Sequence, residues 1–268
     1  HAHPIVACSD GGATTEAGSF SWILSKTDGK RLVWCSGAAP RTVSSSFRSE
    51  GYGVISLLCF FTRIALFCNT TLSSMTLLVG TDSESLITRI DNETARRTVH
   101  PNDTLVADWD ITNEIQHHLR SFAFSLTLQH VKGHQEDDTP YDELPLLAQL
   151  NVDADALASQ YMLDHPRTTS RVPRLTHNLC QLELPPGSIN GRYKNTIRIA
   201  ALREDIWAYL RHRNSWTETT ISSIDWPAFE QSFNHGSFFT HRVALVKHVH
   251  GISPTGKIAH RNDSSYPQ

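Results

Sequence analysis

The sequence has 268 residues, of which 39% are hydrophobic, so it can form one large domain with a substantial core. The net charge of −3 is unevenly spread, because residues 1–165 carry 11 Lys and Arg against 20 Asp and Glu, whereas residues 166–268 carry 13 against 7. This composition predicts a globular protein and disfavours a repeat or low-complexity chain. The asymmetry fits a basic arm beside an acidic, cation-binding domain, or simply solvated surface charge.

Five cysteines are spread widely through the chain, and none belongs to a CxxC pair. We expect free thiols, and therefore an intracellular protein in a reducing compartment. The longest apolar run, residues 54–61, is too short to span a bilayer, so no membrane partner is expected. The chain begins without a methionine, which suggests a segment of a longer polypeptide.

The first part of the chain has the pattern of a three-stranded meander followed by a long helix. Strands are predicted at residues 4–10, 19–26 and 30–38, with an Asp-Gly turn between the last two. Residues 44–67 have helical spacing, and Glu50 lies on the apolar stripe of that helix. A carboxylate beside a buried stripe is costly unless it has a partner.

Strands and helices then alternate. A short buried-type strand ends at Asp82, and the elements predicted from there are strand 75–82, helix 83–90, helix 110–121, strand 123–133 and helix 149–161. A meander followed by alternating strands and helices predicts an α/β domain with a mixed sheet.

The composition changes after residue 164. Residues 166–191 are rich in Pro, Arg and polar side chains, which is typical of a linker or a wrapped arm. Helical patterns return in three stretches, residues 194–213, 225–233 and 239–251. The predicted organisation is a domain over residues 1–165, the linker or arm, and a basic helical extension over residues 192–268.

Two aspartates lie close together in the predicted helix 149–161. Successive side chains on a helix turn by about 100°, so Asp153 and Asp155 point to nearly opposite faces and cannot serve the same site. Asp155 shares its face with Ala158 and Met162, beside the buried stripe. Only one of the two is expected to serve a site, and Asp155 is the candidate.

Asp10, Glu50, Asp82 and Asp155 stand where a folded chain normally avoids carboxylates. Each has an ordinary explanation, as a turn residue, a rim residue, a helix cap or a surface group. Adjacent strand ends converge, however, and two carboxylates ~4 Å apart repel by roughly 4 kcal/mol at an effective dielectric of about 20. A cation has to offset this repulsion, and oxygen donors without His or Cys favour Mg²⁺ or Mn²⁺ over Zn²⁺. Two such ions commonly support attack of water on a phosphodiester.

Five motifs occur in a recognisable order, "CSDGGA", "SSFRSEGYG", "VGTDSESL", "VKGH" and "NVDADALA". Over about residues 4–163 the chain resembles the type 1 ribonuclease H domain, in the version carried by reverse-transcriptase-bearing retroelements. The resemblance implies a ribonuclease H-like fold, with a five-stranded mixed sheet flanked by helices. It also implies that Asp10, Glu50, Asp82 and Asp155 are catalytic and hold two Mg²⁺ or Mn²⁺ ions.

The resemblance assigns further residues to the site. His134 matches the family's mobile histidine, which is implicated in proton transfer and product departure, although a lone loop histidine is usually solvated surface. Substrate contacts are implied for five residues, Gly11, Gly12, Ser45, Ser46 and Asn151. Serines just before a helix are, alternatively, often N-caps.

The implied function is hydrolysis of the RNA strand of an RNA–DNA hybrid, recognised by shape and 2′-hydroxyl contacts. A reverse transcriptase domain in the same polypeptide is the expected partner. Basic residues of the extension are candidates for added substrate affinity, or else pack on the domain or the polymerase: Arg192, Lys194, Arg198, Arg203, Arg211 and Arg213.

Two other functions fit parts of the sequence. A catalytically silent domain that spaces or binds nucleic acid is the alternative, and the intact set of four carboxylates with His134 disfavours it. A transposase or integrase of the DDE type uses related sheet geometry. The helix-borne Glu50, between the first and second aspartates, and the "DADALA" helix disfavour that class.

Overall fold

The structure is a computed structural model, and it divides into two compact units, His1–Thr196 and Ile197–Gln268. The residues that it describes are 5–14, 18–39, 46–73, 75–95, 101–122, 124–165, 175–177, 182–184, 187–191 and 193–225. The predicted helices at residues 225–233 and 239–251 lie almost wholly outside the described part. The first unit contains all the elements that position the site.

Five strands form one mixed sheet in the order β3-β2-β1-β4-β5. Their bounds are Ile5–Ala13 (β1), Gly18–Lys26 (β2), Arg31–Ala39 (β3), Thr76–Thr81 (β4) and Ser125–His130 (β5). The first three pair antiparallel, whereas β4 pairs parallel with both β1 and β5. The meander and the five-stranded mixed sheet predicted from the sequence are therefore confirmed.

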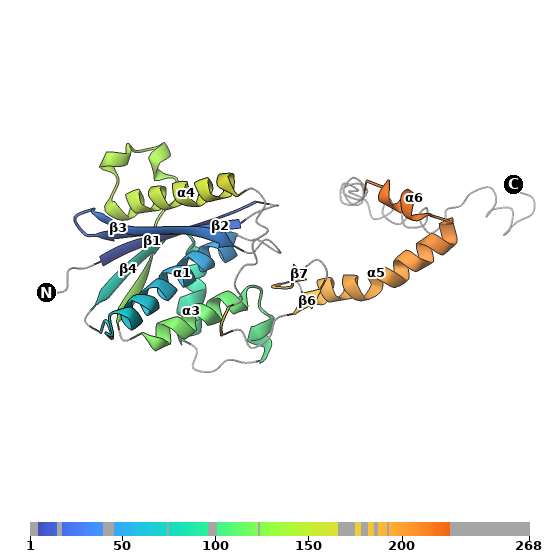
Figure 1. Ribbon diagram of the computed structural model, residues 1–268, viewed down its shortest axis with the longest axis horizontal. Coiled ribbons are helices and arrows are strands. Elements are labelled where there is room, and N and C mark those ends of the chain that lie inside the picture. The colour runs from blue at the N-terminus through green and yellow to red at the C-terminus, as the bar shows by residue number, and fades with distance from the viewer. Residues whose placement is uncertain are drawn as a thin grey trace, which may run out of the picture. The chain divides into compact units, whose positions relative to one another are not determined.

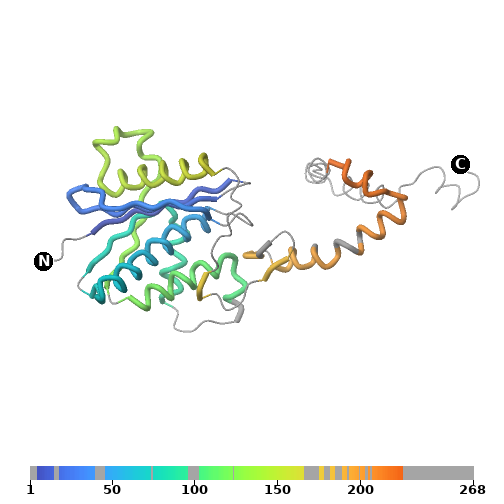
Figure 2. Tube along the Cα trace, in the orientation of Figure 1, coloured from blue at the N-terminus to red at the C-terminus, as the bar shows by residue number. Residues whose placement is uncertain are grey.

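Four helices cover the two faces of this sheet. They are α1 (Ser46–Phe67), α2 (Glu84–Ala95), α3 (Trp109–Ser121) and α4 (Leu146–Asp164). In Figures 1 and 2, α4 lies over one face, and α1 and α3 lie over the other. Successive side chains of a strand point to opposite faces, so Val6 packs in the cluster with Leu150 of α4 while Ala7 packs in the cluster with Leu57 of α1.

Helix α1 is the central helix of the domain. The apolar residues predicted to share the stripe of Glu50 are all buried: Val54, Leu57, Leu58 and Phe61. By length and composition alone α1 could also cross a membrane, which the short apolar run at residues 54–61 did not predict. Half of the 18-residue stretch that makes α1 apolar enough to do so is buried within the protein, against the sheet and neighbouring helices.

Glycines let α1 approach the sheet and α3 more closely than other residues would. A Cβ atom on Gly53 would overlap the hydroxyl of Ser9, and one on Gly51 would overlap the side chain of Ile111 in α3. A Cβ atom on Gly11 of β1 would overlap the backbone of Ser49 and its neighbour in α1. This close packing of α1 on β1 places Glu50 beside Asp10 and Gly11.

Replacing Gly53 by alanine is expected to lower the free energy of unfolding by about 1–3 kcal/mol, because the added methyl overpacks the α1–sheet interface. The effect would oppose the gain of roughly 1 kcal/mol that alanine brings to a helix interior. Ser9→Ala removes the nearest obstacle, so the double variant should recover part of the loss. Urea unfolding measures all three variants, and a midpoint for Gly53→Ala above that of the wild type would show that α1 does not pack this closely.

Several element boundaries differ from the prediction. Helix α4 begins at Leu146 rather than 149, because Pro145 precedes it and a proline at a helix start loses no hydrogen bond. Helix α2 continues to Ala95, beyond the predicted end at residue 90. Three short 3₁₀ helices, η2 (Pro101–Leu105), η3 (Gln135–Asp137) and η4 (Tyr141–Glu143), were not predicted.

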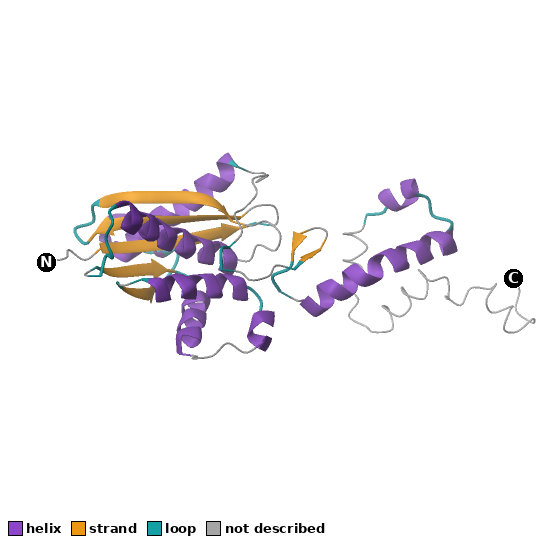
Figure 3. Ribbon diagram, turned by 60° about the horizontal axis from the view of Figure 1, so that its bottom comes forward, coloured by secondary structure: helices purple, strands orange, loops and turns teal. Residues whose placement is uncertain are grey.

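Parts of the predicted linker or arm, residues 166–191, pack against the domain. The amide of Asp108 donates a hydrogen bond to the carbonyl of Asn190 at 2.7 Å, and the side chain of Asn113 donates to the carbonyl of His177 at 3.2 Å. A small hairpin of β6 (Glu183–Leu184) and β7 (Gly187–Ser188) lies between these contacts in the sequence (Figure 3).

Helix α5 (Tyr193–Asn214) matches the predicted helix at residues 194–213, and the short helix α6 (Glu218–Ser222) was not predicted. The Thr217 hydroxyl caps α6 by accepting a hydrogen bond from the amide of Thr220. Arg211 and Glu218 join the two helices through an ion pair of 2.7 Å. The four cysteines within the described residues, Cys8, Cys35, Cys59 and Cys68, are free thiols, and Cys180 lies outside that part.

Candidate active site

The parallel pairing of β1 with β4 brings two of the predicted carboxylates to one edge of the sheet. Cys8 lies opposite Gly80 in this pairing, and each aspartate, Asp10 and Asp82, follows two residues later. Parallel strands keep the same direction, so equivalent positions past the last pair lie side by side. The backbone register alone therefore places the two carboxylates next to each other.

Glu50 completes a cluster of three carboxylates. One oxygen from each of Asp10, Glu50 and Asp82 lies within 4.8 Å of the others. Asp10 is 6% exposed and Glu50 is 4% exposed, whereas Asp82 is half-buried. The amide of Gly11 donates a 2.6 Å hydrogen bond to Oδ1 of Asp10, and the hydroxyl of Thr81 donates to Oε2 of Glu50 at 3.2 Å.

Burial and mutual repulsion make this cluster electrostatically strained when no cation is bound. Burial, followed by the charge of Asp82, raises the pKa of Asp10 from 3.8 to about 6. Burial, followed by the charges of Asp10 and Asp82, raises the pKa of Glu50 well above its usual range. Carboxyls this close together titrate as a coupled group, and a bound cation would offset the repulsion between their charged forms.

The fourth predicted ligand, Asp155, lies half-buried on α4. It is outside the group of three, but its charge is among those that raise the pKa of Asp10. Asp153, two residues earlier, faces β3, where Arg31 binds it at 2.7 Å and the Tyr141 hydroxyl donates to it at 2.8 Å. The two aspartates thus point to different surroundings, as helix geometry predicted, and Asp153 has a structural ion pair.

His134 lies in a loop beside the cluster, and its side chain is exposed. Its backbone has a left-handed conformation, with φ of 53°, and its Nδ1 atom lies 3.7 Å from a carboxylate oxygen of Glu136. The preceding residue, Gly133, lies against Asp82, because a Cβ atom there would be 3.2 Å from Oδ2 of Asp82. The loop therefore reaches the carboxylates, while the imidazole remains 75% exposed.

His134→Ala is expected to slow cleavage by about 10- to 10³-fold, because a single proton-transfer group contributes roughly 10²–10⁴-fold to catalysis. The carboxylate cluster would remain intact, so turnover should persist. Single-turnover cleavage rates of this variant and of His165→Ala, another exposed histidine, provide the comparison. A loss as complete as that of a carboxylate variant would make His134 indispensable and refute the proton-transfer role.

The predicted substrate residues have different environments. Gly11 is buried against α1, and Gly12 is half-buried beside Met162 of α4. Ser46 is exposed as the first residue of α1, and Ser45 lies outside the described residues.

Asn151 is 4% exposed on α4, where its Oδ1 atom accepts a hydrogen bond from Sγ of Cys8 at 3.4 Å. The side chain thus fastens α4 to β1 near the carboxylates. Burial, followed by the charges of Asp10 and Glu50, raises the pKa of the Cys8 thiol, so the thiol stays protonated and able to donate.

Two residues that shape the site were not singled out from the sequence. Thr81 orients Glu50 from the end of β4, and Gly133 leaves room for Asp82. Their positions in the sequence could have indicated both residues, because Thr81 directly precedes the candidate ligand Asp82 and Gly133 directly precedes the candidate catalytic residue His134.

The donor set fits divalent magnesium or manganese. The three clustered side chains offer only carboxylate oxygens, and Asp155 would add a fourth. Hard oxygen ligands suit Mg²⁺ and Mn²⁺ better than Zn²⁺. The raised pKa values of Asp10 and Glu50 are expected of carboxylates whose mutual repulsion a bound cation would offset.

No family model matches this sequence, and no curated protein matches it. Among solved structures, the N-terminal ribonuclease H domain of a Mycobacterium tuberculosis protein is similar at 16% identity and a TM-score of 0.42, over 63% of this chain and 100% of that chain. LC11 ribonuclease H1 in complex with an RNA/DNA hybrid is similar at 17% identity and a TM-score of 0.41, over 58% of this chain and 94% of that chain. A foamy viral protease–reverse transcriptase in complex with double-stranded DNA is similar at 15% identity and a TM-score of 0.43. The similarity covers 59% of this chain and 93% of that chain.

The fold can be named from the sheet and its helices. The strand order β3-β2-β1-β4-β5, with a meander and two parallel strands, carries α4 on one face and α1 and α3 on the other. The motifs that suggested the resemblance lie on these elements in the expected order. The first unit of this chain therefore has the ribonuclease H-like fold.

Proposed function

We propose that the chain hydrolyses the RNA strand of RNA–DNA hybrids with the help of divalent cations. The observation that carries this proposal is the group of Asp10 on β1, Glu50 on α1 and Asp82 directly after β4. One oxygen from each lies within 4.8 Å of the others. Two of the three are almost fully buried, which is costly for carboxylates unless a cation is bound. The family motifs supply the substrate class.

The residues of the chain would have separate roles in cation binding, proton transfer and substrate recognition. Asp10, Glu50, Asp82 and Asp155 would hold the cations, which supply Lewis-acid activation of water and stabilise the charge that develops at the phosphodiester. His134, on its exposed loop, would move a proton to or from the reacting groups and would assist departure of the product. The hybrid would be recognised through its backbone shape and its 2′-hydroxyl groups.

The setting of the enzyme is also a proposal. A reverse transcriptase domain in the same polypeptide, within a retroelement, would supply additional affinity for the hybrid, and the protein would act inside the cell. Four basic side chains of α5 are exposed and could contact phosphates, Lys194, Arg198, Arg211 and Arg213. Arg192 and the side chain of Arg203 lie outside the described part.

A substrate panel tests the proposed function. Purified protein would be incubated with an end-labelled RNA–DNA hybrid, double-stranded RNA, double-stranded DNA and single-stranded RNA, each with Mg²⁺, with Mn²⁺ and with EDTA. We expect cleavage of the RNA strand of the hybrid alone, in the presence of either cation, leaving 3′-hydroxyl and 5′-phosphate ends. Binding of the hybrid without cleavage under every condition would instead support the catalytically silent domain.

A further inference from the structure

A second group of metal-binding side chains lies on α3, away from the carboxylate cluster. One ligand atom from each of Glu114, His118 and His177 lies within 4.8 Å of the others. Glu114 and His118 are one helical turn apart, and His177 comes from the segment of residues 175–177, far along the chain. Glu114 and His118 are buried and His177 is half-buried, so two of the three side chains are shielded from solvent.

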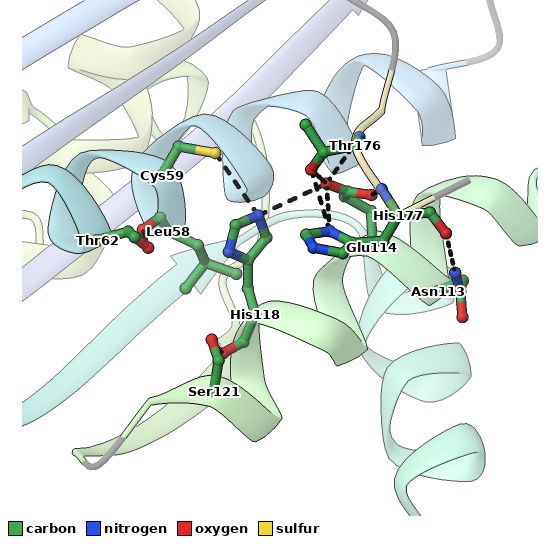
Figure 4. A network of polar contacts seen from close by, with 9 residues as sticks. All are labelled: Leu58, Cys59, Thr62, Asn113, Glu114, His118, Ser121, Thr176 and His177. Atoms are coloured by element: carbon green, nitrogen blue, oxygen red, sulfur yellow. Dashed lines mark hydrogen bonds and ion pairs between the residues drawn. The ribbon is translucent and has the colours of Figure 1, made fainter. Parts of the chain in front are cut away.

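The thiol of Cys59 lies beside His118. Sγ of Cys59, on α1, is 3.6 Å from Nε2 of His118, and Figure 4 shows the thiol and the carboxylate of Glu114 on either side of that imidazole. Cys59 is nine residues from Glu50, or about 13 Å along the helix, so this group is separate from the catalytic carboxylates.

The distances between neighbouring donor atoms fit a tetrahedral site. Nε2 of His118 is 3.7 Å from Oε1 of Glu114, and Nδ1 of His177 is 3.0 Å from the same oxygen. With Zn–N and Zn–O bonds near 2.0–2.1 Å and Zn–S near 2.3 Å, the edges of a tetrahedral zinc site are about 3.3–3.6 Å long. Small side-chain adjustments would therefore bring the donor atoms of Glu114, His118 and His177 onto one ion. The exposed side chain of Cys59, whose Sγ atom contacts His118 but lies outside that group of three, would have to rotate toward them.

We propose that Glu114, His118, His177 and Cys59 form a structural Zn²⁺ site that fastens residues 175–177 to the domain. Nitrogen and sulfur donors favour Zn²⁺ over Mg²⁺, in contrast to the all-oxygen set of the catalytic cluster. Four protein ligands leave no open position for a substrate, as is usual for structural zinc.

Existing contacts already hold the segment in the position that the ion would need. The amide of His177 donates to Oε2 of Glu114 at 2.8 Å, and the Thr176 hydroxyl donates to Oε1 at 2.7 Å. The ring of His117 stacks on that of His177, with centroids 3.3 Å apart. These contacts orient the Glu114 carboxylate and the His177 imidazole, as the groups surrounding a metal site commonly do for its ligands.

Cobalt spectroscopy tests this site on the whole chain. Protein freed of metal with EDTA would be titrated with Co²⁺, which gives strong visible bands only in tetrahedral coordination, and then with Zn²⁺. We expect tetrahedral bands that saturate at one equivalent and vanish when Zn²⁺ is added. A thiolate-to-cobalt charge-transfer band should accompany them and should be absent from Cys59→Ser.

Matched variants make the assignment specific. His118→Phe keeps an aromatic ring beside Phe122 but removes the ligand nitrogen, and Glu114→Gln keeps the side-chain length, so both should lose the bands while circular dichroism remains unchanged. If His118→Phe fails to fold, Glu114→Gln decides. His165→Ala and Asp82→Asn should keep the bands, because an exposed histidine and the catalytic cluster take no part.

Two results would overturn the proposal. One is a wild-type protein without tetrahedral bands at saturating Co²⁺, and the other is bands that survive in both His118→Phe and Glu114→Gln. A charge-transfer band that persists in Cys59→Ser would remove Cys59 from the ligand set. None of these readouts depends on cleavage activity, so the outcome is independent of the proposed nuclease function.

Discussion

Asp82→Asn is expected to reduce cleavage of an RNA–DNA hybrid by roughly 10³-fold or more, because the cation site loses a charged ligand and a bound cation supplies several kcal/mol of transition-state stabilisation. The substitution keeps the side-chain volume, and Asp82 is half-buried at the strand end, so the fold should be retained. Single-turnover cleavage with Mg²⁺ measures the effect, and circular dichroism checks the fold.

Asp153→Asn is the matched control, since it makes the same chemical change on the opposite face of α4. Asp153 pairs with Arg31 in a partly exposed ion pair, so the variant should lose at most about 1 kcal/mol of stability and should cleave normally. The reverse pattern, an inactive Asp153→Asn beside an active Asp155→Asn, would show that the assignment of the two aspartates is wrong.

Without divalent cations the protein is expected to lose stability as the pH rises from about 4 to above 6. Asp10 titrates at about 6 in the folded protein and at 3.8 in its ordinary environment, so the folded state binds the extra proton between these values. Its stabilising contribution is complete below 3.8 and is lost as the pH rises through about 6. The loss from Asp10 is roughly 3 kcal/mol, and Glu50 acts in the same direction.

Mg²⁺ should reverse this loss, because a cation bound only by the folded protein stabilises it by ~2.7 kcal/mol at a hundredfold excess over Kd. In EDTA at neutral pH, Asp82→Asn should melt at a higher temperature than the wild type, since the variant removes one of the charges that repel Asp10 and Glu50. Magnesium should then stabilise the variant less. Thermal melts of both proteins between pH 4 and 8, with EDTA and with millimolar Mg²⁺, measure each effect.

A wild-type melting temperature that does not respond to Mg²⁺, together with no gain for Asp82→Asn in EDTA, would mean that these carboxylates do not share a cation. The nuclease function would then give way to the silent-domain alternative. The proposed zinc site of Glu114, His118, His177 and Cys59 is unaffected by either outcome, because it uses different residues.

Much of the fold could be predicted because its elements carry local signals. The meander, its Asp-Gly turn and the apolar stripe beside Glu50 follow from alternation and helical spacing within a few residues. Local patterns also predicted strand ends at Asp10 and Asp82. Asp82 does follow β4 directly, whereas β1 continues past Asp10 to Ala13, and the two aspartates converge because both lie two residues past the last β1–β4 pair. Boundaries were less predictable, as the earlier start of α4 after Pro145 shows.

Features that depend on contacts between distant segments could not be predicted. The ion pair of Asp153 with Arg31 joins residues that are 122 positions apart, and the sequence offers no local sign of it. The spacing of Glu114 and His118 does suggest a shared helix face. The sequence does not indicate that His177 joins them, because it lies in a polar segment without helix or strand periodicity.

Anomalous scattering from crystals grown with Mn²⁺ tests the central claim most directly, because it locates the cation instead of inferring it from activity. We expect Mn²⁺ peaks in contact with the carboxylate oxygens of Asp10, Glu50 and Asp82, with none at those side chains in crystals of Asp82→Asn. Wild-type crystals at millimolar Mn²⁺ that show these three carboxylates without a peak, or with peaks only elsewhere, would contradict it.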